Sequence, residues 1–258
     1  MKILIIGDVV GNCGTSFLKK NLMTIAKNNG VDMIIANGEN SAKGNGLDST
    51  SADILFSSGV DVITSGNHIW HKYETQNIIN DYENIIRPAN YPAECPGSGY
   101  VIFNAMGVKV LVINVMGTVY LESLSCPFET VEKILKREEG NFDISIVDIH
   151  AEATSEKAAI ARYFDGRLTA VVGTHTHVQT ADERILPNGT AFITDLGMTG
   201  AYESILGVES ERIIKKFLTK MPTRFEQADG ECQFNAVVLE VDNTSYKAVG
   251  IKRIFTLK

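Results

Sequence analysis

The feature that most constrains the fold of this chain is a series of short apolar runs, several of which end in a cluster of polar residues. These runs are Ile3–Ile6, Met33–Ala36, Val60–Ile63, Val108–Val115, Ile144–Ile149 and Ala170–Val172. Each run is rich in valine and isoleucine, and its apolar residues are continuous instead of alternating with polar ones. Such runs are typical of strands that are covered on both faces, as in a largely parallel sheet.

The stretches between the runs have the spacing of amphipathic helices. Apolar residues recur three or four positions apart in Phe17–Ile25, in Val131–Leu135 and in Ile213–Leu218. Because strands and helices alternate, the sequence predicts the α/β class. Residues 88–99 contain three prolines and two glycines and are expected to form a loop.

The last third of the chain has a different pattern. Strand-like runs are joined there by Asn-Gly and Asp-Asn turn signals, and they lie at 191–193, 236–241 and 247–254. We expect these runs to add antiparallel or mixed strands. No linker, repeat or low-complexity tract separates them from the rest, so residues 1–258 are predicted to form a single domain.

Composition excludes several classes of protein. Hydrophobic residues make up 44% and charged residues 21% of the 258 positions, which argues against disordered, collagen-like and coiled-coil chains. The net charge is −7, from 24 basic and 31 acidic residues, and no basic block occurs. A surface that wraps a long nucleic acid is therefore not expected, whereas a small phosphorylated substrate could be held by a local site or by a metal.

The cysteines and the apolar segments indicate in which cellular compartment the protein is expected. The four cysteines lie far apart without a Cys-x-x-Cys pair, so we expect reduced thiols and neither a zinc clip nor a redox dithiol. The first apolar run ends at Gly7-Asp8 and is too short for the core of a signal peptide, and no later run is long enough to cross a membrane. We expect a cytoplasmic protein that does not enter a membrane.

Polar side chains of the kinds that bind metals follow directly on the predicted strands. They are Asp8, Glu39, Asn40, Asn67, His68, His150, His175 and His177. The chain has five histidines, and four of them belong to this set. Ligands of open α/β sheets collect outside the carboxyl ends of the strands, so the sequence predicts a functional site at this edge.

The two histidines at 175 and 177 strengthen this prediction. On an extended segment, residues two positions apart direct their side chains to the same side, so both imidazoles could serve one metal centre or two adjacent ones. A single His-x-His pair is weak evidence, but Asp8, Glu39 and His150 are expected at the same edge. Imidazoles and carboxylates together suit Fe, Mn or Zn, and the absence of cysteine ligands disfavours a structural zinc site.

The same residues carry a resemblance to a known family. Gly7-Asp8, Gly66-Asn67-His68, the isolated His150 and Gly173-Thr-His-Thr-His177 resemble the ordered motif series of the calcineurin-like metallophosphoesterases. Over nearly the whole chain, the motifs Gly-Asp-Val-Val-Gly, Asn-Gly-Glu-Asn and Gly-Asn-His-Ile-Trp resemble more narrowly the YmdB-like branch. The resemblance implies central mixed β-sheets sandwiched by helices, in α/β/β/α order.

Two departures from the wider superfamily are visible. The usual Asp-x-His is Asp8-Val9-Val10 here, which lacks one histidine ligand, and the usual Gly-Asp of the bridging carboxylate is Gly38-Glu39. Both departures are features of the YmdB-like branch, so they support the narrower resemblance.

The resemblance implies two transition-metal ions per chain, Fe and/or Mn, with Zn as a further candidate. Glu39 would bridge the two ions. The first ion would also be bound by Asp8, Asn40 and His177, and the second by Asn67, His150 and His175. His68 would be the general acid that protonates the leaving oxygen. From the residues alone, His68 could instead be a buried structural histidine, and Asn67 a turn residue after Gly66.

The implied function is a binuclear metal-dependent phosphodiesterase. By resemblance it would hydrolyse cyclic nucleotides, either 2′,3′-cyclic or 3′,5′-cyclic monophosphates, by in-line attack of a metal-bridging hydroxide. Two other functions stay open at this point: a metal-bound regulatory or RNA-associated protein with slight hydrolytic activity, and a phosphomonoesterase. The resemblance also implies that copies of the chain self-associate.

Overall fold

The computed structural model describes all 258 residues, and twelve strands form two six-stranded sheets. The first sheet has the order β12-β11-β10-β1-β2-β3. Its strands are β1 (Lys2–Val9), β2 (Met33–Asn37), β3 (Val62–Thr64), β10 (Met198–Ala201), β11 (Cys232–Val241) and β12 (Ala248–Leu257). The second sheet has the order β4-β5-β6-β7-β9-β8. Its strands are β4 (Tyr100–Ala105), β5 (Val108–Met116), β6 (Ile144–His150), β7 (Ala170–Thr174), β8 (Arg184–Ile185) and β9 (Ala191–Ile193).

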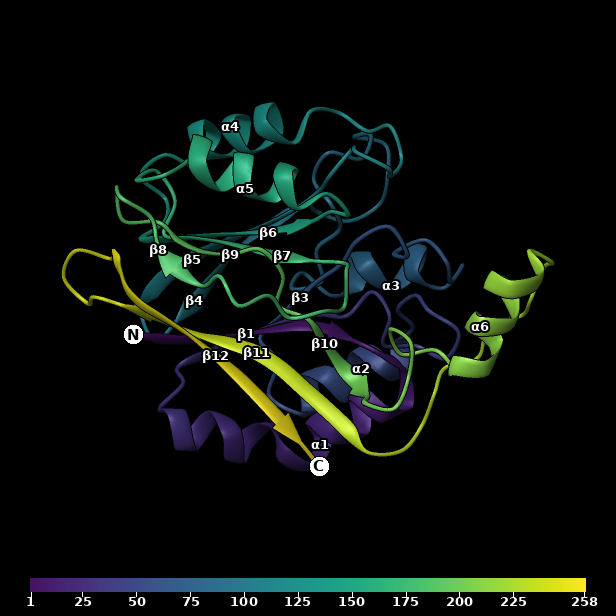
Figure 1. Cartoon of the computed structure of the whole chain (residues 1–258). Coiled ribbons are helices and arrows are strands. Elements are labelled where there is room, and N and C mark those ends of the chain that lie inside the picture. The colour runs from purple at the N-terminus through teal and green to yellow at the C-terminus, as the bar shows by residue number, and fades with distance from the viewer.

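Helices cover the outer faces of the two sheets (Figure 1). The helices are α1 (Gly11–Asn29), α2 (Ser49–Ser57), α3 (Thr75–Asp81), α4 (Pro127–Arg137), α5 (Thr154–Tyr163) and α6 (Ser210–Thr219). Helices α4 and α5 lie over the second sheet, and α1 and α2 lie under the first (Figure 1). The layers therefore follow the predicted α/β/β/α order. None of the helices is both long enough and apolar enough to span a membrane.

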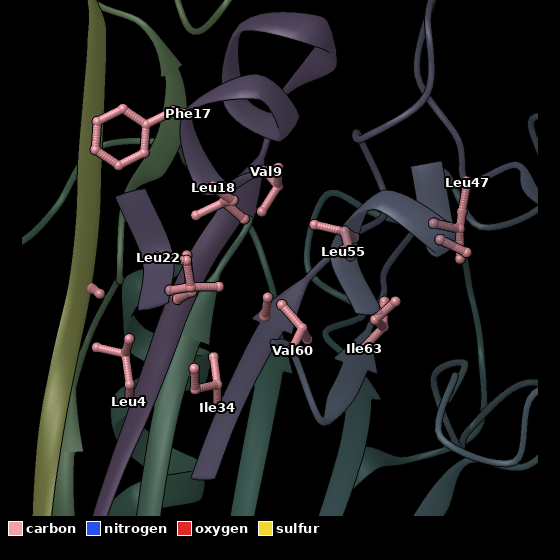
Figure 2. Packing of buried hydrophobic residues seen from close by; sticks show 14 of the residues in the cluster. Leu4, Val9, Phe17, Leu18, Leu22, Ile34, Leu47, Leu55, Val60 and Ile63 are labelled. Carbon is pink, nitrogen blue, oxygen red and sulfur yellow. The ribbon is translucent and has the colours of Figure 1, made fainter. Parts of the chain in front are cut away.

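The continuous apolar runs are explained by cores on both faces of each sheet. In β1, Ile3 and Ile5 join a buried cluster between the two sheets, whereas Leu4 and Ile6 join a cluster under α1 and α2. Figure 2 shows Leu4 close to Leu22 of α1. A third cluster lies between the second sheet and helices α4 and α5. Successive residues of a strand point to opposite faces, so a strand with two cores needs apolar residues at every position.

The central strands run parallel in both sheets. Strand β1 pairs in parallel with β2 and β10, and β6 pairs in parallel with β5 and β7. Strand β11 is antiparallel to β1, β10 and β12, which confirms the expected mixed pairing in the last third of the chain. The chain thus brings the carboxyl ends of β1, β2, β3, β6 and β7 to one end of the sandwich, on the side where α3 and α6 lie (Figure 1).

The predicted helices form, but one of them packs differently from the expectation. Phe17, Leu18 and Leu22 are buried in α1, as their spacing predicts. In α6, by contrast, Ile213 is buried, while Phe217 and Leu218 are 65% and 79% exposed. Helix α6 projects from the body of the molecule (Figure 1), so most of its apolar side does not reach the core of this chain. Residues 88–99 form a loop, as predicted.

Candidate metal centre

The structure brings together all eight side chains that the sequence places at strand ends. They come from both sheets: Asp8 lies in β1 and His150 ends β6, while Glu39 and Asn40 follow β2, Asn67 and His68 follow β3, and His175 and His177 follow β7. Each of them is within 3.6 Å of at least one other member of the set. Residues up to 169 positions apart thus share one small volume.

Three polar groups converge on a single nitrogen of His150. Its Nε2 lies 3.0 Å from Asn67 Oδ1, 3.0 Å from His175 Nδ1 and 3.2 Å from Glu39 Oε1. The ligand atoms of Glu39, His150 and His175 all lie within 4.8 Å of one another. One ring nitrogen cannot satisfy three such partners with a single proton, whereas a cation between them could contact all four groups.

The second group of candidate ligands surrounds Asp8. This carboxylate is fully buried, and its Oδ1 accepts no hydrogen bond although it lies 3.6 Å from His177 Nε2. Its Oδ2 accepts a hydrogen bond from the backbone N–H of His175. A buried carboxylate oxygen without a donor is costly, and a bound cation would remove that cost. The residues present therefore fit the metal ions that the resemblance implies.

The electrostatics of the cluster favour ligand-ready protonation states. Burial alone would raise the pKa of Glu39, but the charges and hydrogen bonds of His150 and His68 outweigh it and hold the pKa well below its ordinary value. Burial and the charge of His150 lower the pKa of His175 to about 4. Glu39 is thus ionised and His175 neutral near pH 7, as metal binding requires.

His150 is protonated in the absence of a cation. Burial would lower its pKa, but the negative charge of Glu39 raises the pKa to about 9. The proton occupies the position between His150 and Glu39 that a cation would take. Metal binding is therefore expected to release a proton from this histidine.

His68 lies at the accessible edge of the cluster. Its backbone N–H donates to Glu39 Oε2 at 2.9 Å, and its side chain is 25% exposed. Its Nδ1 lies 2.8 Å from Asn40 Oδ1, whereas its Nε2 makes no hydrogen bond within the protein. The buried position that the residues left open for His68 is therefore wrong, and its role as general acid stays a prediction. Its ring also packs at 4.3 Å against the exposed His71.

The side chain of Asn40 connects the two halves of the cluster. Its Oδ1 accepts from His68, while its Nδ2 donates to Glu39 Oε1 at 3.1 Å and lies 3.3 Å from His177 Nε2. Asn40 is therefore beside the predicted first metal position, but its amide nitrogen faces the other ligands. Coordination through Oδ1 would require the amide to turn over, which exchanges two groups of similar size.

A buried relay behind His150 was not predicted from the sequence. His150 Nδ1 lies 2.9 Å from Thr174 Oγ1, and this hydroxyl donates to Asp148 Oδ1 at 2.8 Å. Thr64 Oγ1 and Asn37 Nδ2 donate to the other oxygen of Asp148. A signal existed in the sequence, because Asp148 is a charged residue in an otherwise apolar run and lies two positions before His150, on the same face of β6.

The backbone between the candidate ligands is closely packed at Gly66. A Cβ atom at this position would overlap the imidazole of His150 and the carboxylate of Glu39. Glycine therefore lets the turn after β3 approach the centre and places Asn67 next to His150.

The segment from His175 to His177 is not extended, which corrects the geometry expected for this pair. The φ angles are +100° at His175 and +63° at His177, a region that residues with a Cβ atom rarely adopt. Both rings still face the cluster, since His175 Nδ1 lies 3.0 Å from His150 Nε2 and His177 Nε2 lies 3.6 Å from Asp8 Oδ1. Such backbone conformations persist where surrounding contacts over-determine them, and they concentrate at functional sites.

A buried ion pair holds this segment. Lys157 Nζ lies 2.7 Å from Asp195 Oδ2, and both side chains are at most 1% exposed. The same carboxylate accepts from the backbone N–H groups of Thr176 and Gly197. The ion pair therefore fixes the residue between the two histidines and stabilises their unusual backbone conformation.

Comparison with known proteins points to one family. The chain matches the family model described as YmdB-like protein over residues 4–254. It is 46% identical over 254 residues to the 2′,3′-cyclic-nucleotide 2′-phosphodiesterase of Bacillus subtilis (strain 168), a match that covers 98% of this chain and 96% of the relative.

Two solved structures extend the comparison. A novel phosphatase from Mycoplasma pneumoniae superposes with a TM-score of 0.94 at 33% identity, over 100% of this chain and 93% of that one. A protein from Staphylococcus aureus assigned as a 5′-nucleotidase superposes with a TM-score of 0.62 at 15% identity, over 98% of this chain and 53% of that one. The latter likeness concerns the fold alone.

Proposed function

Because this chain belongs to the YmdB-like protein family, we propose that it is a metal-dependent phosphodiesterase that hydrolyses 2′,3′-cyclic nucleotides. The support comes from the name of its Bacillus relative and from the cluster at the carboxyl ends of the strands. We propose 3′,5′-cyclic monophosphates as the second substrate class. Fe and/or Mn are the metals that these ligands suit best, with Zn as a further candidate.

The observation that carries the proposal is the position of Glu39. Its carboxylate is fully buried and has no lysine or arginine partner, and its Oε1 lies 3.2 Å from His150 Nε2 and accepts from Asn40 Nδ2. A buried carboxylate that faces imidazoles and an amide and lacks a cationic side chain is suited to bridging two cations. We propose that Asp8, Glu39, Asn40 and His177 hold one ion, and that Glu39, Asn67, His150 and His175 hold the other.

When bound, two divalent ions supply Lewis-acid polarisation of the phosphodiester and neutralise the charge that develops on its oxygens. The residues of the chain have separate tasks. The relay from Asp148 through Thr174 fixes the ring of His150 and keeps its Nε2 directed at the centre. When the amide of Asn40 is turned over for coordination, its Nδ2 faces His68 Nδ1 and can donate to it, which leaves the proton of the His68 ring on Nε2.

In this proposal His68 protonates the leaving oxygen of the cyclic diester. An alkoxide is a poor leaving group, and a positioned acid typically contributes about 10²–10⁴-fold to the rate. The partly exposed ring at the edge of the cluster allows Nε2 to meet a substrate that approaches from solvent. The transferred proton ends on the hydroxyl that is released, while the other ester bond of the ring remains.

The test compares substrates that differ in their need for a proton. For His68→Ala, we expect unchanged metal content, a loss of about 10²–10⁴-fold on adenosine 2′,3′-cyclic phosphate, and a much smaller loss on an aryl diester with a good leaving group. His71→Ala is the matched control, because His71 is an exposed neighbour that packs on His68 and makes no side-chain hydrogen bond or ion pair with the metal ligands.

Other outcomes would favour the alternative functions. Equal losses on both substrates would mean that His68 positions the phosphate or holds the metals. Faster hydrolysis of nucleoside monophosphates than of diesters would favour a phosphomonoesterase. A metal-loaded protein that turns over neither class but binds RNA would favour the regulatory role.

Self-association and a cytoplasmic location complete the proposal. Self-association is proposed from the resemblance, and light scattering on the purified protein tests it. The cytoplasmic location is proposed from the cysteines and the apolar segments, and cell fractionation tests it.

A further inference from the structure

A hollow of about 540 Å³ lies directly beside the candidate metal centre. Its lining includes His177, Met198, Tyr202, Gln233, Asn235 and Phe255. Ligand pockets typically enclose about 300–1,000 Å³, so the hollow is large enough for part of a nucleotide. None of these residues except His177 belongs to the proposed metal centre.

The hollow and the centre share a wall. The ring of His177 directs Nε2 to Asp8, 3.6 Å away, while its Nδ1 donates to the carbonyl of Leu206, which lines the hollow. Met198 of β10 is the register partner of Asp8 in β1. Neighbouring strands lie only about 4.8 Å apart, so a ligand in the hollow is within one nucleotide's length of the carboxylate.

The lining combines flat apolar surfaces with amide groups. Tyr202 and Phe255 are 42% and 54% exposed, although large aromatic side chains are usually buried. Gln233 and Asn235 supply amides from β11, and Arg253 lines the same space. Aromatic faces with a few amides are the groups that stack on a nucleobase and bond to its edge.

Asn235 adds an unsatisfied acceptor to this lining. The residue is 2% exposed, and its Nδ2 donates to the carbonyl of Met198 at 2.9 Å. Its Oδ1 is buried and accepts no hydrogen bond. An unpaired buried amide oxygen is costly, and a shift of the side chain toward the hollow would let the N–H group of a ligand satisfy it.

We propose that this hollow receives the nucleobase of the substrate, with the base between Tyr202 and Phe255 and a base N–H directed at Asn235. The inference rests on the proposed phosphodiesterase function and adds a specificity site to it. It makes the enzyme selective for nucleotides over cyclic phosphodiesters that lack a base.

The kinetic test uses two substrates that differ only in the base: adenosine 2′,3′-cyclic phosphate and methyl riboside 2′,3′-cyclic phosphate. For Phe255→Ala and Tyr202→Ala, we expect KM for the nucleotide to rise by about tenfold to a hundredfold, the range for loss of one base–aromatic stack, with kcat nearly unchanged. The constants for the methyl riboside should not change. Phe217→Ala, an exposed aromatic on α6, is the control and should affect neither substrate.

A binding measurement separates failure of this inference from failure of the proposed function. Calorimetry with adenosine 3′-monophosphate should show weaker binding to Phe255→Ala than to the wild type, whether or not the protein turns over a diester. Unchanged binding, or equal kinetic effects on the two substrates, would overturn the nucleobase site. If the wild type hydrolyses neither substrate but binds the nucleotide through Phe255, the proposed function fails and the site stands.

Discussion

The buried relay behind His150 should control how tightly the second metal ion is bound. In the relay, Asp148 accepts from the Thr174 hydroxyl at 2.8 Å, and Thr174 Oγ1 lies 2.9 Å from His150 Nδ1. Because the Thr174 hydroxyl gives its proton to the carboxylate, it can only accept from the ring, so Nδ1 must carry the ring proton. When metal binding releases the other ring proton, the lone pair of His150 is on Nε2, which faces Glu39 and Asn67.

The substitution Asp148→Asn keeps the shape of the side chain but removes its charge. Next to the uncharged amide in this variant, the Thr174 hydroxyl can turn its proton toward Nδ1 of His150. The ring proton then moves to Nε2, and this tautomer cannot bind a metal through Nε2. Losing such an outer partner typically costs about 10–100-fold in metal affinity, equivalent to about 1.4–2.7 kcal/mol. Asp148 is only 3% exposed, and the two threonine hydroxyls can reorient, so the fold should be retained.

Competition with a chelator measures the effect. We expect one metal ion of Asp148→Asn to dissociate about 10–100-fold more readily, while the other is held as in the wild type. Asp182→Asn is the matched control, because Asp182 also accepts from two threonine hydroxyls but contacts no histidine. Unchanged affinity in Asp148→Asn, or an equal drop in the control, would refute the relay.

Three further variants test other parts of the centre. Gly66→Ala should lose most of its metal, because the added Cβ overlaps two ligand side chains. Gly250→Ala is the control and should keep its metal, because its added Cβ faces a flexible exposed side chain. Elemental analysis of both variants measures the metal content. Asn40→Ala should lose the first ion preferentially, and site-resolved anomalous scattering with both ions present, or both absent, would show that Asn40 is not a ligand. Lys157→Met leaves Asp195 as an unpaired buried charge and should lower the free energy of unfolding by about 3–5 kcal/mol in urea titrations; a loss below about 1 kcal/mol would contradict the structural role of the ion pair.

The class of the fold could be predicted from hydrophobic patterning, because continuous apolar runs such as Ile3–Ile6 require cover on both faces. The pattern does not say what provides the cover. Ile3 and Ile5 face the other sheet and Leu4 and Ile6 face helices, and both surroundings select the same residue types. The second layer of sheet was therefore expected only from the resemblance. The apolar spacing of α6 predicted the helix but not its exposed position. The spacing shows which side of a helix is apolar, but it does not show what that side packs against.

The candidate ligands could be predicted because each of them lies at the carboxyl end of a strand or shortly after it. The residues that hold the candidate ligands in place could not be predicted, since their roles depend on contacts between distant segments. Thr174 and Asp148 belong to two different strands and meet only when these pair. The positive φ angles of His175 and His177 depend on Asp195, which the local sequence does not reveal.

Anomalous scattering from crystals of the metal-loaded protein tests the central claim most directly. The account predicts two metal peaks per chain, one bounded by Asp8, Glu39, Asn40 and His177 and the other by Glu39, Asn67, His150 and His175, with Glu39 in contact with both. A single peak, or two peaks that do not share Glu39, would contradict the binuclear centre.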